Sequence, residues 1–375
     1  MGVVDLSSAA YWEDESIDVR LNPRRNYPTA GLIEFLREEL SLKNAIVLAT
    51  SGSSGEPKFA VLQKEAVLAS ARSVVNHLDL SSEDSWLAGL SDFHVGGIGM
   101  YARGHITGAD VSEFAAETWQ REGFLFVQAL ERTKASWTSL TPTHLFDLVS
   151  HTVRCPESVK GVLLGGGIIR PRLVEAALEL GWPILASYGM TEACSQIATA
   201  TSGETEWLPV LSEWETSVNG EGRLRIRGEA LFSGYVVSTS DGWTMNPARD
   251  ATGWFATGDR VDLRKGKLRF LGRMDDLVKV SGELVSISSV ESRLNEILAK
   301  SGSVGAITTV SDARRGCELV AVVEGSHSAG HFEKELLDSI PGIERPGRVV
   351  VVETLPRTDL GKVDRASLRD WVTDC

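Results

Sequence analysis

Short apolar runs alternate with segments of helical periodicity through the first half of the chain. Residues 31–42, for example, carry Leu32, Ile33, Leu36 and Leu40 at the spacing of one helix face. This alternation favours an α/β fold with a largely parallel sheet covered by helices. The other helices predicted here lie at 64–78, 97–107, 121–132, from Pro142 and at 171–180, the last two opened by proline, and the strands at 86–88, around 111, 135–140, 162–164 and 183–186.

The pattern changes between residues 197 and 271. Short β-like runs at 222–227, 254–256, 261–263 and 268–271 are separated by turns that contain glycine and aspartate, which predicts a β-rich subdomain. After Gly272-Arg273-Met274-Asp275-Asp276 the α/β pattern returns. It predicts helices at 289–299 and 331–340 and strands at 306–310 and 319–323.

The chain has 375 residues, too many for one ordinary core. We therefore expect two domains, residues 1–272 and 273–375, with the boundary at 272–276. Hydrophobic residues make up 42% and charged residues 24%, as in a globular protein.

The net charge of −13 argues against a nucleic-acid-binding protein, which needs clustered Lys and Arg. Four scattered cysteines without a CxxC pair suggest neither a zinc site nor a disulfide framework and are typical of reduced thiols. The first residues lack the apolar run of a signal peptide, and no stretch is long enough to span a membrane. The expected location is cytoplasmic.

A Gly/Ser-rich segment at residues 50–58 follows one apolar run and precedes another. Small residues let consecutive backbone N–H groups converge on an anion, hydroxyl groups add donors, and Lys58 adds positive charge. A polyphosphate cradle is the chemical interpretation, and a flexible turn between two strands is the alternative. The glycine spacing is not that of a Walker A loop. The candidate phosphate residues are Thr50, Ser51, Gly52, Ser53, Ser54, Gly55 and Lys58.

Four further residues have side chains suited to a nucleotide. Thr191 and Glu192 offer adjacent hard oxygen ligands for Mg²⁺ bound with phosphates; the alternative is a helix N-cap with an acid in its first turn. Tyr188 can lie flat against a purine or be a half-buried aromatic at a strand end. Asp259 can accept from both ribose hydroxyls or be a turn aspartate.

Six motifs occur in a fixed order and together closely resemble the acyl-adenylate-forming superfamily of acyl-CoA synthetases, luciferases and peptide-synthetase adenylation domains. They are the loop at 50–58, Ser-Tyr-Gly-Met-Thr-Glu at 187–192, Thr-Gly-Asp at 257–259, Gly-Arg-Met-Asp-Asp at 272–276, Val-Ser-Gly-Glu at 280–283, and Pro-Arg-Thr-Asp-Leu-Gly-Lys-Val-Asp-Arg at 356–365. The resemblance covers the chain from about residue 48 to its end.

This resemblance implies a large N-terminal domain of stacked sheets flanked by helices, with a β-rich subdomain, and a small mobile C-terminal α/β domain. It implies ATP-dependent conversion of a carboxylic acid to an acyl-adenylate and then, with CoA, to a thioester. The substrates and cofactor would be ATP, CoA, Mg²⁺ and a small carboxylic acid, with neither nucleic acid nor a membrane span involved.

The resemblance also assigns roles to residues outside the phosphate loop. Lys362 is the expected catalytic group, its ammonium aimed at charge that develops on the phosphoryl oxygens; a solvated loop lysine is the alternative. Arg273 would approach the ribose or form a surface ion pair, and Asp275 would be the hinge or a solvated linker acid. Gly166 and Gly189 join Tyr188, Asp259 and Arg273 in the ATP site, and Ser281 and Gly282 would pass the pantetheine chain of CoA.

The acid pocket is expected between His94, residues 165–168 and residues 187–190. Residues 93–97 and 140–145 resemble the corresponding segments of o-succinylbenzoate–CoA ligases of menaquinone synthesis. His94 would close the acid site or bind a carbonyl, and a histidine packed at a helix start is the alternative. The predicted pocket residues are His94, Thr143, Gly165, Gly166, Ser187 and Met190.

Thr50 comes early, whereas the family usually has well over a hundred residues before this loop. Much of the usual N-terminal subdomain is expected to be absent, which fits a small aromatic dicarboxylate and leaves room for a homodimer partner to complete the pocket. The second carboxylate would need a cationic or amide partner, for which Arg103 and Arg170 are the candidates. The alternatives are another aryl or acyl acid passed to CoA or a carrier protein, and an inactive nucleotide-binding paralogue.

Overall fold

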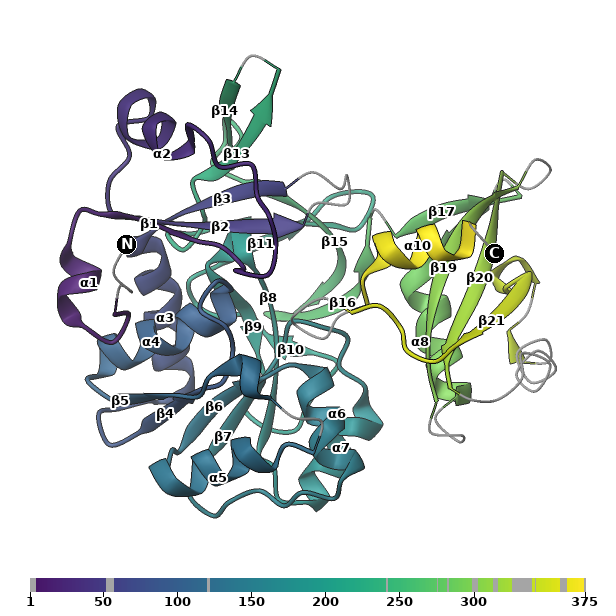
Figure 1. Cartoon of the computed structure of the whole chain (residues 1–375), viewed down its shortest axis with the longest axis horizontal. Helices are drawn as coiled ribbons and strands as arrows, with labels where there is room; N and C mark the ends of the chain where they lie inside the picture. The colour runs from purple at the N-terminus through teal and green to yellow at the C-terminus, as the bar shows by residue number, and fades with distance from the viewer. Residues whose placement is uncertain are drawn as a thin grey trace. The chain divides into compact units, whose positions relative to one another are not determined.

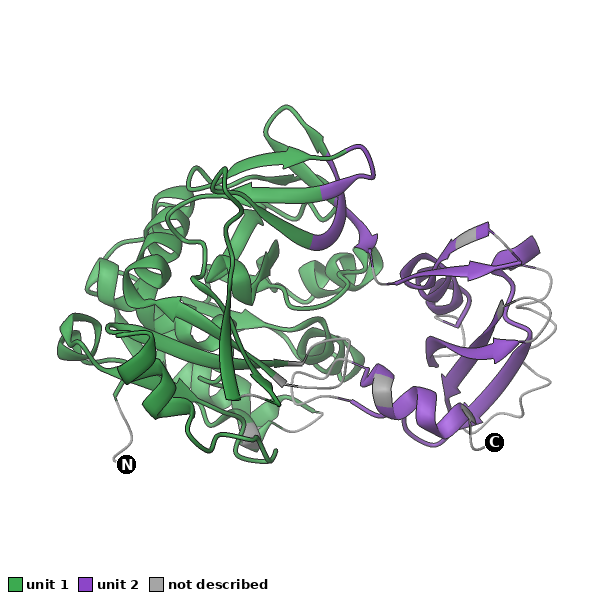
Figure 2. Cartoon of the chain, turned by 90° about the horizontal axis from the view of Figure 1, so that it is seen from above, with its two compact units in different colours: residues 1–219, 224–257, 263–269 green, residues 220–223, 258–262, 270–375 purple. Residues whose placement is uncertain are grey.

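The computed structural model describes residues 5–51, 57–119, 122–240, 242–274, 276–281, 283–298, 303–312, 316–325, 339–340, 342–357 and 363–373. The chain forms two compact units (Figure 2). The first holds residues 1–219, 224–257 and 263–269, and the second holds 220–223, 258–262 and 270–375. The long segment of the second unit begins at Phe270, close to the boundary predicted at 272–276.

A six-stranded sheet in the order β5-β4-β6-β7-β8-β9 forms one layer of the first unit (Figure 1). All its neighbouring strands are parallel except β8 and β9, which are antiparallel, so the predicted largely parallel sheet is confirmed. The strands are β4 (Ser85–Ala88), β5 (Asp110–Glu113), β6 (Trp137–Leu140), β7 (Gly161–Leu164), β8 (Ile184–Met190) and β9 (Ser195–Thr199).

Helices cover both faces of this sheet because its crossovers run in two directions. The step from β4 to β5 moves toward one edge, and the steps from β5 to β6, β7 and β8 move toward the other. Since such crossovers are right-handed, α4 (Val95–Thr107) lies on one face and α5 (Phe124–Thr133), α6 (Pro142–Ser150) and α7 (Pro171–Glu179) lie on the opposite face. Apolar side chains of α5, α6 and α7 and of the strands form one buried cluster there.

Strand β8 corrects one prediction. The sequence placed Ser187, Tyr188 and Gly189 after a strand at 183–186, yet β8 continues to Met190. The reason is that β9 folds back antiparallel and pairs with residues 187–190, with a register shift between Tyr188 and Gly189. Apolar patterning ends at Ala186 and does not reveal that the next strand pairs with residues 187–190.

A second sheet has the order β1-β2-β3-β13-β14. Its strands are β1 (Ile17–Arg20), β2 (Ala45–Ser51), β3 (Pro57–Gln63), β13 (Gly234–Thr239) and β14 (Gly242–Pro247). The predicted helix at 64–78 is confirmed as α3 (Lys64–Leu78), which packs against α4. The helix predicted at 31–42 is instead a short α2 (Leu32–Glu34) that continues as one π-helical turn over Phe35–Glu39.

A third sheet, in the order β10-β16-β15-β12-β11, corresponds to the predicted β-rich region. Its strands are β10 (Leu208–Pro209), β11 (Glu215–Val218), β12 (Arg223–Arg227), β15 (Phe255–Arg264) and β16 (Lys267–Arg273). The two strands predicted at 254–256 and 261–263 are one strand, β15. Its buried positions Thr257, Asp259 and Val261 keep the alternation of a strand although two of them are polar. The hairpin of β13 and β14 belongs to the second sheet.

The long segment of the second unit is again α/β. Strands β19 (Val304–Asp312), β20 (Gly316–Glu324) and β21 (Arg348–Val352) form a sheet, with α8 (Ile287–Leu298) packed in one apolar cluster and α10 (Arg365–Thr373) in another. A hairpin of β17 (Leu277–Val280) and β18 (Glu283–Ser286) precedes α8. Residues 331–338 of the helix predicted at 331–340 lie outside the described residues. Within the described ranges no helix is long and apolar enough to cross a membrane.

A buried lysine joins α3 to the N-terminal segment that contains α1 (Ala9–Glu13). The Lys64 side chain is fully buried, and its Nζ donates to the carbonyl oxygens of Tyr11 at 2.5 Å and Asp14 at 3.2 Å. The ammonium also pairs with the Asp14 carboxylate and lies 4.4 Å from the centroid of the Tyr11 ring. These charge-assisted bonds satisfy a cation that could not otherwise be buried.

We expect Lys64→Met to lower the free energy of unfolding by about 3 kcal/mol, because the variant leaves buried carbonyl groups without their donor. Chemical denaturation of the protein, followed by the fluorescence of the tryptophans in the first unit, measures this loss. The matched control is Lys43→Met, which breaks the Lys43–Glu15 pair to the same segment. Both side chains of that pair are about two-thirds exposed, at 66% and 69%. A surface pair contributes about 0.5 kcal/mol or less, so equal losses in the two variants would contradict the assignment.

Candidate functional site

The centre of the candidate site is the turn from β8 into β9. A Cβ atom on Gly189 would lie 1.8 Å from the carbonyl oxygen of Ser195, so only glycine permits this backbone approach. Thr191 and Glu192 occupy the 3₁₀ turn Thr191–Ala193 that joins the strands. Thr191 is the first residue of the turn and not its N-cap, which is Met190. Thr191 is therefore not a helix cap, whereas Glu192 is the acid in the first turn, as the alternative for this pair expects.

Glu192 is held by a segment that the sequence analysis did not single out. The hydroxyl of Tyr235, on β13, donates to Glu192 Oε1, and the backbone N–H of Phe232 donates to the Glu192 carbonyl oxygen at 2.9 Å. Lys58 Nζ lies 5.8 Å from the centroid of the Tyr235 ring. The structure thus brings Lys58 and Glu192 to the same tyrosine. Only the pairing of β13 with β3 reveals Tyr235, since no local signal separates it from an ordinary strand aromatic.

Thr191 and Glu192 suit a magnesium ion that arrives with phosphates better than a resident metal. Among the described residues no group of three or more His, Cys, Asp or Glu side chains could hold a metal. Mg²⁺ usually takes one or two protein oxygen ligands together with substrate phosphates and water. One hydroxyl and one carboxylate on a sheet-edge turn match that requirement.

The phosphate loop is described only at its two ends. Strands β2 and β3 pair antiparallel from Ala45 opposite Gln63 to Ser51 opposite Pro57, and the Thr50 hydroxyl donates to the Lys58 carbonyl oxygen at 3.2 Å. The ends of the loop are therefore fixed side by side. Its tip, Gly52, Ser53, Ser54 and Gly55, lies outside the described residues.

Several predicted acid-pocket residues lie together at the carboxyl ends of the parallel strands. A Cβ on Gly165 would lie 2.6 Å from Ser187 Oγ, and the Ser187 hydroxyl donates to the Leu164 carbonyl oxygen at 3.1 Å. Gly166 has φ +78°, and a Cβ there would meet no atom within 4 Å, so its surroundings are open. Thr143 is in the first turn of α6, whose Pro142 ring approaches Gly167.

His94 is the residue before α4, and its carbonyl oxygen accepts from Ile98 N–H at 3.1 Å. The preceding loop is tied to the N-terminal segment by an ion pair between Asp92 and the buried Arg20. A Cβ on Gly97 would lie 2.2 Å from the Ser91 carbonyl oxygen, so helix and loop are packed backbone to backbone. The position of His94 is fixed by these contacts, and its chemical role stays a prediction.

Arg103, one of two candidates for a second carboxylate, is buried on α4 with 2% exposure. Its guanidinium carbon lies 4.5 Å from the centroid of the Trp86 ring. A Cβ on Gly99 would lie 3.2 Å from Arg103 Nη1 and 3.5 Å from Ser195 Oγ, so the guanidinium reaches the start of β9, opposite Met190. Arg170, the other candidate, is the half-buried residue before α7.

The predicted ribose residues belong to the second unit. Asp259 is buried, and its Oδ1 lies 3.5 Å from Nη1 of Arg273, whose side chain is 52% exposed. A Cβ on Gly258 would lie 2.8 Å from Arg273 Nη2, so the guanidinium packs against this glycine. The two residues are together, as a shared ligand requires; contact with ribose stays a prediction.

Three predicted residues, Asp275, Gly282 and Lys362, lie outside the described residues. Arg357 and Val363 form an antiparallel bridge, so the two ends of the segment that contains Lys362 are adjacent. Ser281 has φ +52° in the turn between β17 and β18. Its proposed contact with CoA is untested by this geometry.

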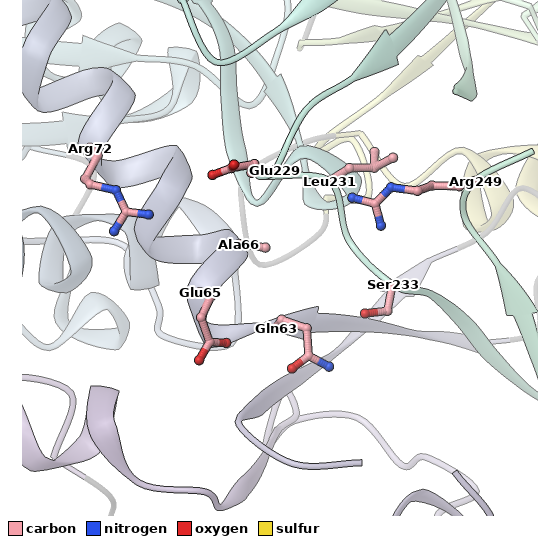
Figure 3. Close-up of a pocket in the computed structure, with 8 residues that line it drawn as sticks. All are labelled: Gln63, Glu65, Ala66, Arg72, Glu229, Leu231, Ser233 and Arg249. Atoms are coloured by element: carbon pink, nitrogen blue, oxygen red, sulfur yellow. The ribbon is translucent and has the colours of Figure 1, made fainter. Parts of the chain in front are cut away.

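A cavity of about 330 Å³ lies away from these residues, at the end of β3 opposite Lys58 (Figure 3). Figure 3 shows Arg72 and Arg249 on two sides of it, and Glu65 and Glu229 are also among its lining residues. None of the predicted site residues lines it. The lining residues are Gln63, Glu65, Ala66, Arg72, Glu229, Leu231, Ser233 and Arg249.

Comparison with known proteins agrees with the motif order. The sequence model described as AMP-binding enzyme matches residues 37–236. The chain is 32% identical over 332 residues to 2-succinylbenzoate–CoA ligase of Escherichia coli (strain K12), covering 86% of this chain and 68% of the relative. The ligase of the same name from Bacillus subtilis (strain 168) is 30% identical over 348 residues, covering 87% and 68%.

Solved structures show the same similarity. O-succinylbenzoate coenzyme A synthetase from Bacillus subtilis in complex with ATP and magnesium ion superposes with a TM-score of 0.72 at 27% identity, covering 86% of this chain and 69% of that chain. The same enzyme in complex with the acyl-adenylate intermediate OSB-AMP gives 0.72 at 28% identity, covering 87% and 69%. The predicted two-domain α/β fold is confirmed.

The histidine at the start of α6 makes stability depend on pH. His144 packs against the Trp119 ring at a centroid distance of 4.2 Å, and the Thr141 N–H donates to its Nδ1 at 3.5 Å. Burial lowers the pKa of His144 from 6.5 to about 4. Below about pH 6.5 the unfolded chain therefore binds a proton that the native chain does not, and stability falls with pH until the native group also titrates.

We expect the first unit to lose about 2 kcal/mol through His144 between pH 7 and pH 5, and His144→Gln to remove that part of the loss. Urea unfolding at the two pH values measures it. His151→Gln, at the exposed C-terminal end of the same helix, is the matched control for the loss of an imidazole ring. An unchanged dependence in His144→Gln would mean that the ring is charged in the native protein.

Proposed function

Since this chain belongs to the family of AMP-binding enzymes, we propose that it is an AMP-forming acid–thiol ligase that converts 2-succinylbenzoate to its CoA thioester in menaquinone biosynthesis. Its substrates are ATP, CoA and a small carboxylic acid, and its cofactor is Mg²⁺. In the first step a carboxylate oxygen attacks the α-phosphorus of ATP and pyrophosphate leaves. In the second the CoA thiol loses its proton and attacks the acyl carbon, and AMP leaves.

The observation that carries the choice of acid is the buried guanidinium of Arg103. Burial lowers the pKa of Arg103 to about 9, and no acidic residue opposes this effect. In the described part of the chain its Nε has no hydrogen-bond partner. An uncompensated buried cation is strongly unfavourable unless a ligand supplies the counter-charge. The second carboxylate of 2-succinylbenzoate supplies it, whereas a simple monocarboxylic acid does not.

The remaining residues divide the work of the first step. Lys58 and the loop at 50–58 bind the phosphates, Thr191 and Glu192 hold Mg²⁺, and Asp259 with Arg273 binds the ribose. When bound, Mg²⁺ neutralises charge on the phosphates. Lys362 donates to the phosphoryl oxygens as their charge grows, which stabilises the transition state more than the bound substrates.

The second step depends on residues of the C-terminal segment. We place the hinge at Asp275 and the path of the pantetheine chain at Ser281 and Gly282, because these positions match the motifs of the superfamily. A cytoplasmic location and a homodimer that completes the acid pocket are the remaining parts of this proposal and stay predictions. A carrier protein in place of CoA is the alternative acceptor.

Mass spectrometry of the purified protein with ATP, Mg²⁺, CoA and a panel of acids tests the function. We expect 2-succinylbenzoate to give an acyl-adenylate and a CoA thioester, because the site supplies both a phosphate cradle and a buried cation. Acyl-adenylate without thioester would indicate the carrier protein as acceptor. No product from any acid would indicate the inactive paralogue.

Lys362→Ala distinguishes the two reaction steps. It should form acyl-adenylate about 10²–10³-fold more slowly, the usual effect of losing a preorganised donor, yet still convert supplied acyl-adenylate and CoA to thioester. Equal damage to both steps would contradict the role given to Lys362.

Arg103→Met tests the choice of acid. We expect the KM for 2-succinylbenzoate to rise about 100-fold with the KM for ATP unchanged, because a buried charged pair is worth about 2–5 kcal/mol. Thermal stability should not fall, since the variant removes an uncompensated buried charge. Arg72→Met, an exposed arginine on α3, is the control. An unchanged KM for the acid in Arg103→Met would exclude this arginine as the carboxylate partner.

A further inference from the structure

We propose that Tyr235 is a positioning residue that orients the Glu192 carboxylate for Mg²⁺ and keeps Lys58 separate from it. This inference rests on the proposed function, because it assumes that Glu192 holds the metal and that Lys58 binds phosphate. It adds a residue that lies in none of the six motifs. Tyr235 touches neither reacting atom in this scheme and acts through its two charged neighbours.

One short segment, residues 232–235, holds both the backbone carbonyl and the carboxylate of Glu192. The Phe232 N–H donates to the Glu192 carbonyl oxygen at 2.9 Å, and the Tyr235 hydroxyl donates to Glu192 Oε1. The rings of Phe232 and Tyr235 pack edge to face with centroids 4.8 Å apart, which stiffens the segment between the two contacts. With backbone and carboxylate both held, Glu192 has few rotamers to lose when a metal binds.

The position of Tyr235 on its strand places it beside Lys58. Tyr235 pairs with Ala60 across the antiparallel ladder of β13 and β3. Lys58 is two residues before Ala60, so its side chain is on the same face and diagonal to Tyr235. Between them lies the small, fully buried side chain of Ala60, and Lys58 Nζ lies 5.8 Å from the ring centroid. The ladder therefore places the lysine over the ring.

The opposite charges of Lys58 and Glu192 must stay apart if each is to bind its own ligand. A lysine and a glutamate that share a neighbour would tend to pair, and each would then be lost to its ligand. No ion pair joins Lys58 to Glu192 among the residues that the structure describes. The ring face attracts the ammonium, and the hydroxyl occupies one carboxylate oxygen, which leaves Oε2 for the metal. Tyr235 thus lies between Lys58, which remains available for phosphate, and Glu192, which remains available for Mg²⁺.

Calorimetric titration of ATP at a series of Mg²⁺ concentrations, without acid, tests this role with Tyr235→Phe. The variant keeps the ring and loses only the hydroxyl. We expect the Mg²⁺ concentration that half-saturates the gain in ATP affinity to rise about 10-fold, the usual scale for losing a group that orients a metal ligand. ATP affinity in EDTA should stay within about 2-fold of the wild type, because Lys58 still rests on the ring. A purely structural defect would lower both.

Two further variants complete the experiment. Tyr235→Leu removes the ring as well and should also lower ATP affinity in EDTA, by about 3-fold or more. Tyr101→Phe removes a hydroxyl that has no hydrogen-bond partner in the described ranges and should match the wild type. An unshifted Mg²⁺ dependence in Tyr235→Phe would overturn the inference.

The outcomes also separate this inference from the proposed function. If the wild type binds ATP with Mg²⁺ but makes no acyl-adenylate, the proposed activity fails, and the Mg²⁺ shift of Tyr235→Phe still decides the role of the tyrosine. If Mg²⁺ does not raise ATP affinity in the wild type, Glu192 is not a metal ligand. The role given to Tyr235 and the metal site of the proposed function are then both rejected.

Discussion

The close passage of two backbones at Gly189 determines the candidate site. Because Gly189 carries no Cβ, the Ser195 carbonyl can approach to a distance that any side chain would forbid, and β9 folds back along the last residues of β8. That fold makes the 3₁₀ turn which presents Thr191 and Glu192. It also sets Ser195 beside the guanidinium of Arg103. One glycine therefore positions the proposed metal ligands and the Ser195 end of β9 that lies beside Arg103.

Each cation in the first unit is stabilised according to its task. Lys64 is buried with acceptors on several sides, so it holds the N-terminal segment and has no capacity left for a ligand. Lys58 rests on an aromatic ring, which attracts an ammonium without neutralising it. Arg103 has the ring of Trp86 and no acid, so its charge is satisfied least. The degree of compensation thus separates a structural cation from the two for which we propose anionic ligands.

The sequence predicts elements well where the signal is local. The helix at 64–78 and the helix opened by Pro142 were correct because apolar spacing and proline both act within a few residues. Predictions fail where strand pairing decides the structure: β8 continues to Met190 because β9 joins it, and β15 runs unbroken through buried Thr257 and Asp259. Tyr235 was missed for the same reason, since only its pairing with β3 brings it to Glu192.

Motifs and packing therefore carry different information about function. The reaction can be predicted from ordered motifs because phosphate, ribose and Mg²⁺ are the same for every member of the family. The acid differs between members, and the residue that we propose to select it, Arg103 on α4, lies outside the six motifs. The residue type of Arg103 indicates only a charge, whereas its 2% exposure and the lack of an acidic partner among the described residues favour an anionic ligand. The proposed choice of substrate therefore rests on the burial of one charge and not on the pattern of residues around it.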